Sequence, residues 1–106
     1  MYIRRYNKLV RDRIPEIIEN SGRKAVAETL NDVDYKEYLH NKLSEEMHEY
    51  LESGSVDELA DLIEVIYALL DYNGVSISDF EDLRKKKAIG RGTFNKRLLL
   101  KEVVEE

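Results

Sequence analysis

Acidic residues at a regular spacing are the part of this sequence best suited to chemistry. Glu45 and Glu46 are followed by Glu49, and further along the chain Glu58 is followed three residues later by Asp61. Side chains three positions apart lie on one face of a helix, with Cβ atoms about 5–6 Å apart. Carboxylates are seldom buried unless they are paired or bind a cation. If these acids face a protein core, they therefore predict a cation site.

The apolar pattern places both acidic motifs on helices joined by a short turn. We predict one helix from Asp34 to about Leu51 and the next from Ser55 to about Tyr72. Asp34 and Ser55 each precede a Glu by three residues, which is the spacing of a capping box. Because the turn at 52–55 is short, the pair is predicted to be an antiparallel helical hairpin.

Three of the acids fall at core-facing positions of these helices. On a wheel of about 100° per residue, Glu46 lies inside an apolar stripe of the first helix. The stripe consists of Leu39, Leu43, Met47 and Tyr50. The second helix is apolar around almost its whole circumference, which predicts burial on several sides. Glu58 and Asp61 nevertheless lie among its apolar side chains.

Antiparallel pairing would place the two motifs opposite each other. Glu49 and Glu58 are equally far from the centre of the turn, and so are Glu46 and Asp61. Equal distance means equal height, so we expect two rungs of acids about 4.5 Å apart along the helix axes. Oxygen ligands without His or Cys favour a hard cation, Mg²⁺ first and Mn²⁺ next.

Other interpretations of these acids stay open. They could form a solvated acidic face, although their core-facing positions penalise that arrangement. Glu58 could instead be the capping-box partner of Ser55, which would leave the other core-facing acids unexplained. Glu45 and Glu64 are either outer ligands or ordinary surface acids.

Basic residues gather at the two ends of the sequence. Residues 1–27 carry seven Lys and Arg against three Asp and Glu, 28–82 carry two against sixteen, and 83–106 carry eight against three, for a net charge of −5. This distribution argues against a double-stranded nucleic-acid partner, which needs a dominant basic face. A carboxylate-bound Mg²⁺ shares its open positions with phosphate oxygens. The predicted phosphate contacts are Lys8, Arg11, Lys42, Lys87 and Arg91.

The rest of the chain predicts a small all-α protein with a single domain over residues 1–106. The absence of Cys excludes disulfides, zinc-thiolate sites and thiol nucleophiles. Shorter helices are expected over 14–22 and from Ser78 to near Gly90, whereas 91–106 is either an extended arm or a helical piece. No apolar run has membrane-spanning length and no signal segment is recognisable, so we expect a soluble cytoplasmic protein.

Together, these motifs resemble a family of all-α enzymes. Glu45-Glu46-x-x-Glu49 followed by Glu58-x-x-Asp61 is similar to the nucleotide pyrophosphohydrolases of the MazG-like, phosphoribosyl-ATP pyrophosphohydrolase and dimeric dUTPase types. Residues 6–15, Tyr-Asn-Lys-Leu-Val-Arg-Asp-Arg-Ile-Pro, and the later Lys-x-x-x-Arg-Gly-x-Phe of 87–94 resemble a small MazG-like subgroup. The resemblance covers nearly the whole chain.

The resemblance implies Mg²⁺-dependent hydrolysis of a nucleoside triphosphate between its α and β phosphates. The products would be a monophosphate and pyrophosphate, and the role would be the removal of non-standard nucleotides. The implied metal ligands are Glu46, Glu49, Glu58 and Asp61. The implied catalytic residues are Glu45, Glu46 and Glu49, with the choice of the acid that activates water left open.

The resemblance also implies a homodimer or homotetramer whose helical hairpins form a shared four-helix bundle. Two other functions stay open, namely hydrolysis of phosphoribosyl-ATP and a catalytically inert helical dimerisation or regulatory module. Only eight residues separate Glu49 from Glu58, whereas many MazG-like proteins have a longer spacer. This difference leaves the identity of the substrate open.

Overall fold

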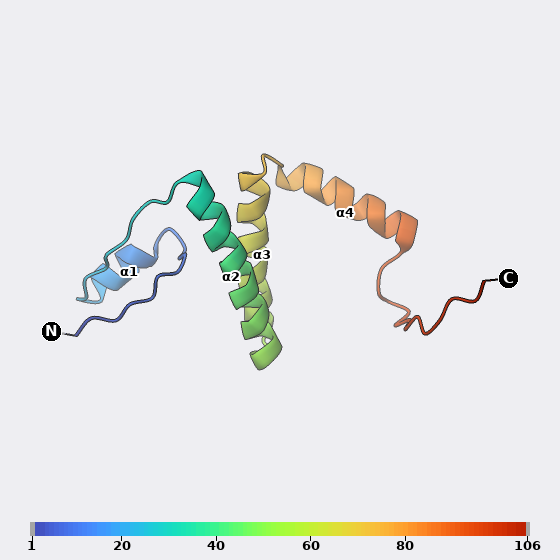
Figure 1. The fold of residues 1–106 in the computed structure, drawn as a ribbon, viewed down its shortest axis with the longest axis horizontal. Helices are drawn as coiled ribbons and strands as arrows, with labels where there is room; N and C mark the ends of the chain where they lie inside the picture. The colour runs from blue at the N-terminus through green and yellow to red at the C-terminus, as the bar shows by residue number, and fades with distance from the viewer. Residues whose placement is uncertain (1, 106) are drawn as a thin grey trace. The chain divides into compact units, whose positions relative to one another are not determined.

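The computed structural model of this chain describes residues 2–105. Its helices are α1 (Ile14–Asn20), α2 (Asp32–Ser53), α3 (Val56–Tyr72) and α4 (Ile77–Arg91), shown in Figure 1. No strand occurs in the described range, so the predicted all-α class is confirmed. The chain divides after Gly74 into two compact units. Compactness does not show whether the units fold separately, so the single domain over 1–106 stays a prediction.

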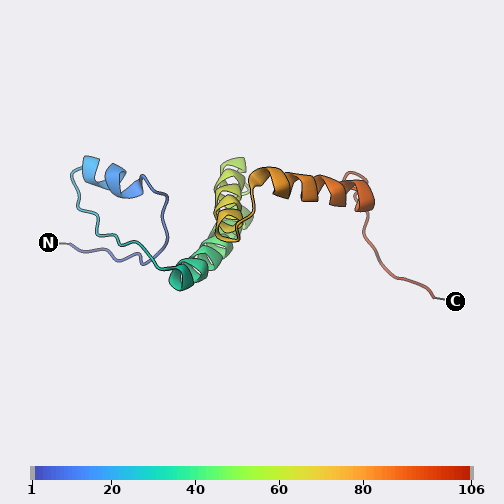
Figure 2. The same ribbon diagram turned by 90° about the horizontal axis from the view of Figure 1, so that it is seen from above.

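Helices α2 and α3 form the packed centre of the first unit. Gly54 and Ser55 connect them, and Gly54 has a φ of 65°, in the left-handed region that favours glycine. The two helices pack side by side, as both ribbon views show (Figures 1 and 2). Leu39 and Val65, exposed by 1% and 8%, are the buried apolar side chains of the described residues. This packing carries the acids of α2 and α3 toward each other.

The start of α2 differs from the predicted one. The helix begins at Asp32 rather than Asp34 because Asn31 is its N-cap. The Asn31 Oδ1 atom accepts a hydrogen bond from the backbone N–H of Asp34 at 2.8 Å. Asn and Asp are equally good caps, so the sequence offers two candidate starts, and the capping box predicted at Asp34 is wrong.

Ser55 is the N-cap of α3, as predicted, but without a capping box. Its side chain forms no cap hydrogen bond with any described residue. The backbone N–H of Glu58 donates to the carbonyl of Ser55 at 3.1 Å instead. The capping-box interpretation of Glu58 is therefore wrong, and its carboxylate is free for other contacts.

Residues 2–31 surround one short helix. The helix predicted over 14–22 begins at Ile14, with Pro15 in its first turn, and ends at Asn20, after which the chain continues through Ser21 and Gly22, which has a φ of 90°. Residues 24–30 are irregular. An irregular stretch at 8–12 precedes α1 and supplies side chains to the site described below.

Several apolar residues of the packed helix pair are exposed. Met47, within the predicted apolar stripe of α2, is 46% exposed, and Leu59 and Ile63 of α3 are 38% and 44% exposed. The prediction that α3 is buried on several sides is thus not met within one chain, because α2 is the one helix of the first unit that packs along it.

The second unit contains α4 and the chain that follows it. Helix α4 begins at Ile77 rather than after Ser78, because the Ser76 Oγ atom accepts a hydrogen bond from the Asp79 N–H at 3.0 Å. None of its residues, all of which the structure describes, is buried. Residues 92–105 form neither helix nor strand, so the helical alternative for this tail is wrong over that range. Glu106, the last residue of the predicted tail, lies outside the described residues.

Within residues 2–105, no helix is both long enough and apolar enough to cross a membrane.

Candidate metal centre

Three of the predicted acids converge between α2 and α3. Glu46 of α2 and Glu58 and Asp61 of α3 each offer a carboxylate oxygen, and the three oxygens lie within 4.8 Å of one another. Glu58 and Asp61 share a face of α3 because they are three residues apart. The structure thus assembles an all-oxygen donor set from the two motifs.

Glu49 lies outside this group of three but close to it. Burial raises the pKa of Glu58, and the charges of Glu49 and Asp61 raise it further. Glu49 also lies near Glu46, whose pKa its charge raises. Four carboxylates are therefore near enough to repel one another, and a cation would relieve that repulsion.

Glu46 is the buried member of the cluster, with 6% of its surface exposed. Its Oε1 atom lies 3.4 Å from the Lys42 Nζ atom, whereas its Oε2 atom is buried without a hydrogen-bond partner among the described residues. Burial raises the pKa of Glu46, and this outweighs the opposing effect of Lys42. A buried oxygen without a partner costs about 1–3 kcal/mol. A proton, a cation or a hydrogen bond from water would satisfy it.

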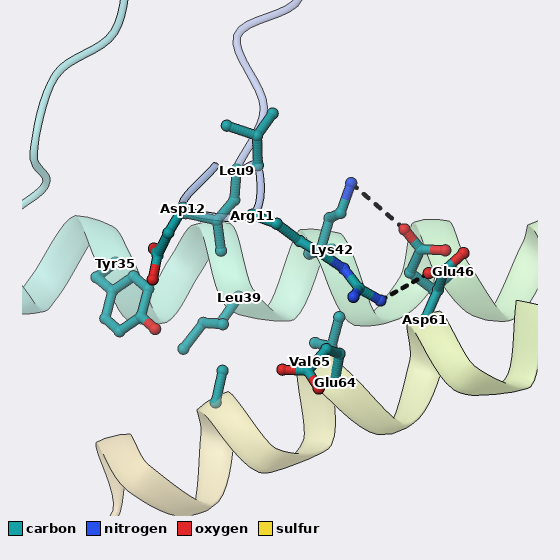
Figure 3. Close-up of a pocket in the computed structure, with 12 residues that line it drawn as sticks. Leu9, Arg11, Asp12, Tyr35, Leu39, Lys42, Glu46, Asp61, Glu64 and Val65 are labelled. Carbon is teal, nitrogen blue, oxygen red and sulfur yellow. Dashed lines mark hydrogen bonds and ion pairs between the residues drawn. The ribbon is translucent and has the colours of Figure 1, made fainter. Parts of the chain in front are cut away.

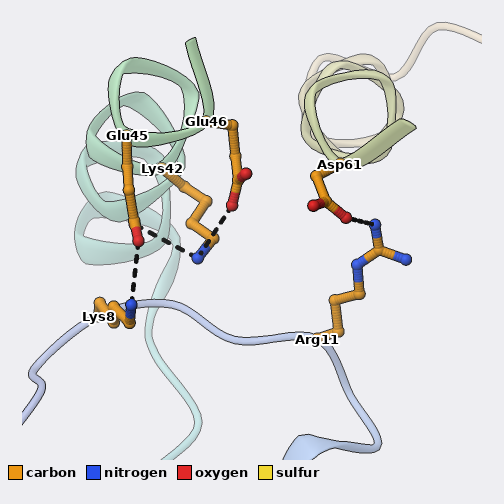
Figure 4. A network of polar contacts seen from close by, with 6 residues as sticks. All are labelled: Lys8, Arg11, Lys42, Glu45, Glu46 and Asp61. Carbon is orange, nitrogen blue, oxygen red and sulfur yellow. Dashed lines mark hydrogen bonds and ion pairs between the residues drawn. The ribbon is translucent and has the colours of Figure 1, made fainter. Parts of the chain in front are cut away.

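Three of the predicted phosphate contacts pair with acids in this structure (Figure 4). Lys8 donates to Glu45 Oε1 at 3.0 Å, and the Lys42 Nζ atom lies 3.3 Å from Glu45 Oε2. Arg11 donates to Asp61 Oδ1 at 2.7 Å. The sequence indicated the side chains but not their partners, because these contacts from residues 8–12 cross 37 and 50 positions of the chain.

The two lysines make Glu45 different from Glu46. Burial acts to raise the pKa of Glu45, but the hydrogen bond from Lys8 and the charge of Lys42 outweigh it and lower that pKa. The hydrogen bond to Glu45 in turn raises the pKa of Lys8. Glu45 is thus held ionised between two ammonium groups, while the neighbouring Glu46 is biased toward its protonated form.

Glu46 and Asp61 border a pocket of about 300 Å³, and charged and apolar side chains line different parts of it (Figure 3). Lys42, Glu46 and Asp61 line its charged part, and the exposed Glu64 also lines it. The apolar lining comes from Leu9, Val10, Leu39, Val65 and Ala68. This volume is at the lower end of the range for small-molecule sites, roughly 300–1,000 Å³.

Sequence reasoning missed part of this pocket. Asp12 and Tyr35 lie together at the end away from Glu46 (Figure 3), and the Tyr35 ring packs edge-on against Tyr72 with 6.1 Å between the ring centroids. Burial raises the pKa of Tyr35, and the charges of Asp71 and Asp12 raise it further. Leu9 and Val10 also line the pocket. Their apolar side chains, placed between Lys8 and Arg11, are the signal in the sequence that could have indicated that this segment contacts the helices.

Lys87 and Arg91, the two other predicted phosphate contacts, belong to the second unit. They line a separate hollow of about 540 Å³ near the end of α4, together with Arg84, Gly92 and the 97% exposed Phe94. Both side chains are exposed. This hollow combines cationic groups with one aromatic ring.

The fold and the site define a small all-helical protein with an acidic cluster at a pocket. Comparison with known proteins does not define its class more closely. A stretch of 42 residues, 40% of the chain, is 55% identical to an uncharacterized protein of Mycolicibacterium smegmatis. The match covers 43% of that relative, so the chain spans less than half of its length. No family model and no solved structure matches the chain.

Proposed function

We propose that this chain is a Mg²⁺-dependent nucleotide pyrophosphohydrolase, as its resemblance to the MazG-like proteins suggests. It would cleave a nucleoside triphosphate between the α and β phosphates and release a monophosphate and pyrophosphate, as in the removal of non-standard nucleotides. The observation that carries the proposal is the buried Glu46 Oε2 atom, which lacks a partner within the described chain beside the carboxylates of Glu58 and Asp61.

The donor set fits a hard divalent cation. Glu46, Glu58 and Asp61 would hold it, and the nearby Glu49 is the proposed fourth ligand. Mg²⁺ is the first choice and Mn²⁺ the second, because every donor is a carboxylate oxygen. When bound, the ion supplies charge neutralisation for the phosphates and a more acidic water.

The other side chains of the pocket suit the rest of such a substrate. Lys42, whose side chain is 17% exposed, is held in place by two carboxylates and would bind a phosphate oxygen at the rim of the pocket. The apolar lining around Leu39 and Val65, which lies between Glu46 and Tyr35 in Figure 3, would receive the base or sugar. Glu45, Glu46 and Glu49 are the proposed acids for positioning or deprotonating water.

The basic residues farther from the acids complete the proposal. Lys8 and Arg11 in the first unit, and Lys87 and Arg91 in the second, would contact phosphates. Variants of each residue would separate binding from folding, because all four side chains are exposed.

Exposed apolar side chains support the proposed assembly. Leu51, Val56 and Ile63 on the α2 and α3 pair are 70%, 76% and 44% exposed. A homodimer or homotetramer would cover them if the antiparallel α2–α3 hairpin were half of a four-helix bundle. We further propose a cytoplasmic protein without a double-stranded nucleic-acid partner.

Two alternatives share parts of this structure. Phosphoribosyl-ATP would be hydrolysed by the same acids, and a different base would occupy the rest of the pocket. A catalytically inert helical dimerisation or regulatory module is favoured by one observation, namely that Arg11 and Lys42 already pair with Asp61 and Glu46. In that case the acids would be neutralised within the chain.

The proposal is tested by thermal unfolding with increasing Mg²⁺ or Mn²⁺, followed by pyrophosphate release from a panel of nucleoside triphosphates and phosphoribosyl-ATP. We expect the melting temperature to rise with the cation, because binding stabilises the folded state, and turnover on at least one compound. Glu46→Gln should abolish both effects. Glu52→Gln, an exposed acid on the same helix, is the matched control. Absence of both effects in the wild-type protein would favour the inert module.

A further inference from the structure

The irregular segment at residues 8–12 is tied to both helices of the acidic site. Its Lys8 donates to Glu45 of α2 at 3.0 Å, and its Arg11 donates to Asp61 of α3 at 2.7 Å. Figure 4 shows the segment crossing beneath the two helices, with one cationic side chain rising to each. The segment therefore places a positive charge on one of the three carboxylates of the candidate metal centre.

The cations at this site differ in how firmly they are held. Lys42 is on α2, one turn before Glu46, and its side chain is 17% exposed. Arg11 is on irregular chain, and its side chain is 56% exposed where it meets Asp61, which is 43% exposed. Exposed ion pairs contribute little stability. Of the two cation contacts on the three clustered acids, the Arg11–Asp61 pair is the more exposed to solvent, although its 2.7 Å separation is shorter than the 3.4 Å between Lys42 and Glu46.

Arg11 and a divalent cation would compete for the Asp61 carboxylate, because both are positively charged and both bind its oxygens. A guanidinium does not lose its proton in proteins, so it makes way only by moving. A doubly charged ion at the clustered carboxylates would attract Asp61 more strongly than one guanidinium does, and it would repel Arg11. Guanidinium groups bind phosphate oxygens in a bidentate manner, so a nearby phosphate would offer Arg11 a new partner.

We propose that Arg11 is an internal counter-ion that a divalent cation displaces from Asp61, which transfers the Arg11 guanidinium from the acidic cluster to the phosphates of the ligand. This inference rests on the proposed function, because it assumes that the cluster binds a cation. Lys8 stays on Glu45 and anchors the segment at α2 during the exchange. Arg11 is then a positioning residue for the empty site and a binding residue for the loaded one.

Because Arg11 competes with the cation for Asp61, removal of its charge should strengthen cation binding. Removal of a residue that only supports the site should weaken cation binding. We would measure Mn²⁺ binding without nucleotide, by electron paramagnetic resonance, for the wild-type protein, Arg11→Gln and Arg13→Gln. Arg13 is the matched control because it is exposed, pairs with Glu16 at 3.4 Å, and loses the same charge when changed. We expect Arg11→Gln to bind Mn²⁺ several-fold more tightly, and Arg13→Gln to stay within about twofold of the wild type because exposed, distant charges are screened. Equal or weaker binding by Arg11→Gln would overturn the proposal.

A second measurement on the wild-type protein does not depend on any variant. The Nε–Hε resonance of Arg11 should move when Mg²⁺ saturates the protein, since the guanidinium leaves its carboxylate partner, while that of Arg13 should not. Mg²⁺ binding that leaves the Arg11 resonance in place would refute the exchange but keep the proposed function. If neither Mg²⁺ nor Mn²⁺ binds, both proposals fail.

Discussion

The two units of this chain show how differently the same local charge spacing behaves in a packed and in an unpacked setting. In the first unit, Lys42 and Glu46 lie four residues apart on α2, with side chains that are 17% and 8% exposed. In the second, Glu81 and Arg84 lie three residues apart on α4, with side chains that are 39% and 55% exposed. Both are ion pairs within one helix turn. The first lies on a helix packed against α3, and there burial raises the pKa of its acid.

The difference teaches that burial, more than charge content, creates the candidate site. The first unit holds nine Lys and Arg against sixteen Asp and Glu, and the second holds eight against six. Acids on an exposed helix are solvated and need no ligand. The acids of α2 and α3 meet across a helix contact that includes Leu39 and Val65, where water is partly excluded. The following changes would break or sharpen this comparison.

The largest effect is expected from the core of the first unit. Leu39→Ala should destabilise the protein by about 3 kcal/mol, because a Leu that is 1% exposed leaves a cavity when shortened. Leu83→Ala on α4, where Leu is 52% exposed, should cost less than about 1 kcal/mol. Urea unfolding of both variants measures the difference. Similar losses for the two would show that the units do not differ in packing as described.

The next effect concerns the two ion pairs. Lys42→Met should destabilise the protein by about 2–3 kcal/mol, since it leaves the buried Glu46 carboxylate without its counter-charge. Arg84→Met should change the free energy of unfolding by no more than about 0.5 kcal/mol, as is usual for exposed pairs. The same urea titration serves, at low salt and without divalent cations. A loss for Arg84→Met as large as that for Lys42→Met would contradict the role given to burial.

The smallest effect has a size that depends on pH. The raised pKa of Glu46 means that the folded protein keeps a proton that the unfolded chain has lost. The stability that this provides is present at low pH and is lost as pH rises from the ordinary Glu value through the folded value. Glu46→Gln removes this penalty, so without cations it should stabilise the protein at neutral pH by about 1 kcal/mol.

The pH series makes that prediction specific. The advantage of Glu46→Gln over the wild type should shrink as pH falls through the raised pKa of folded Glu46, and it should be lost by the ordinary Glu pKa of 4.5. Glu81→Gln on α4 is the comparison variant and should show no gain at neutral pH. The pKa of Glu45 is lowered, so the stability that its ionised form gives the protein is lost as pH falls. This loss occurs in every variant and does not affect the difference between Glu46→Gln and the wild type. A Glu46→Gln gain that is independent of pH would exclude ionisation as its cause.

Sequence reasoning located the helices well and their caps less well. Periodicity is a property of ten or more residues, so α2 and α3 were predicted from their apolar positions. A cap is chosen by one hydrogen bond, and both Asn31 and Ser76 compete with a nearby residue that caps equally well. The convergence of Glu46, Glu58 and Asp61 follows from the spacing of the acids and the brevity of the Gly54-Ser55 connection.

The sequence by itself thus determined the helical class, the burial of Glu46 though not of Glu58 and Asp61, and an excess of acids in the middle of the chain. Only the tertiary structure decided which charges neutralise them. Lys8 and Arg11 reach Glu45 and Asp61 across 37 and 50 residues of chain. No periodicity encodes such contacts, because they depend on where an irregular segment crosses two packed helices. The same packing shields the Glu46 carboxylate from water, whereas the acids of α4 stay solvated.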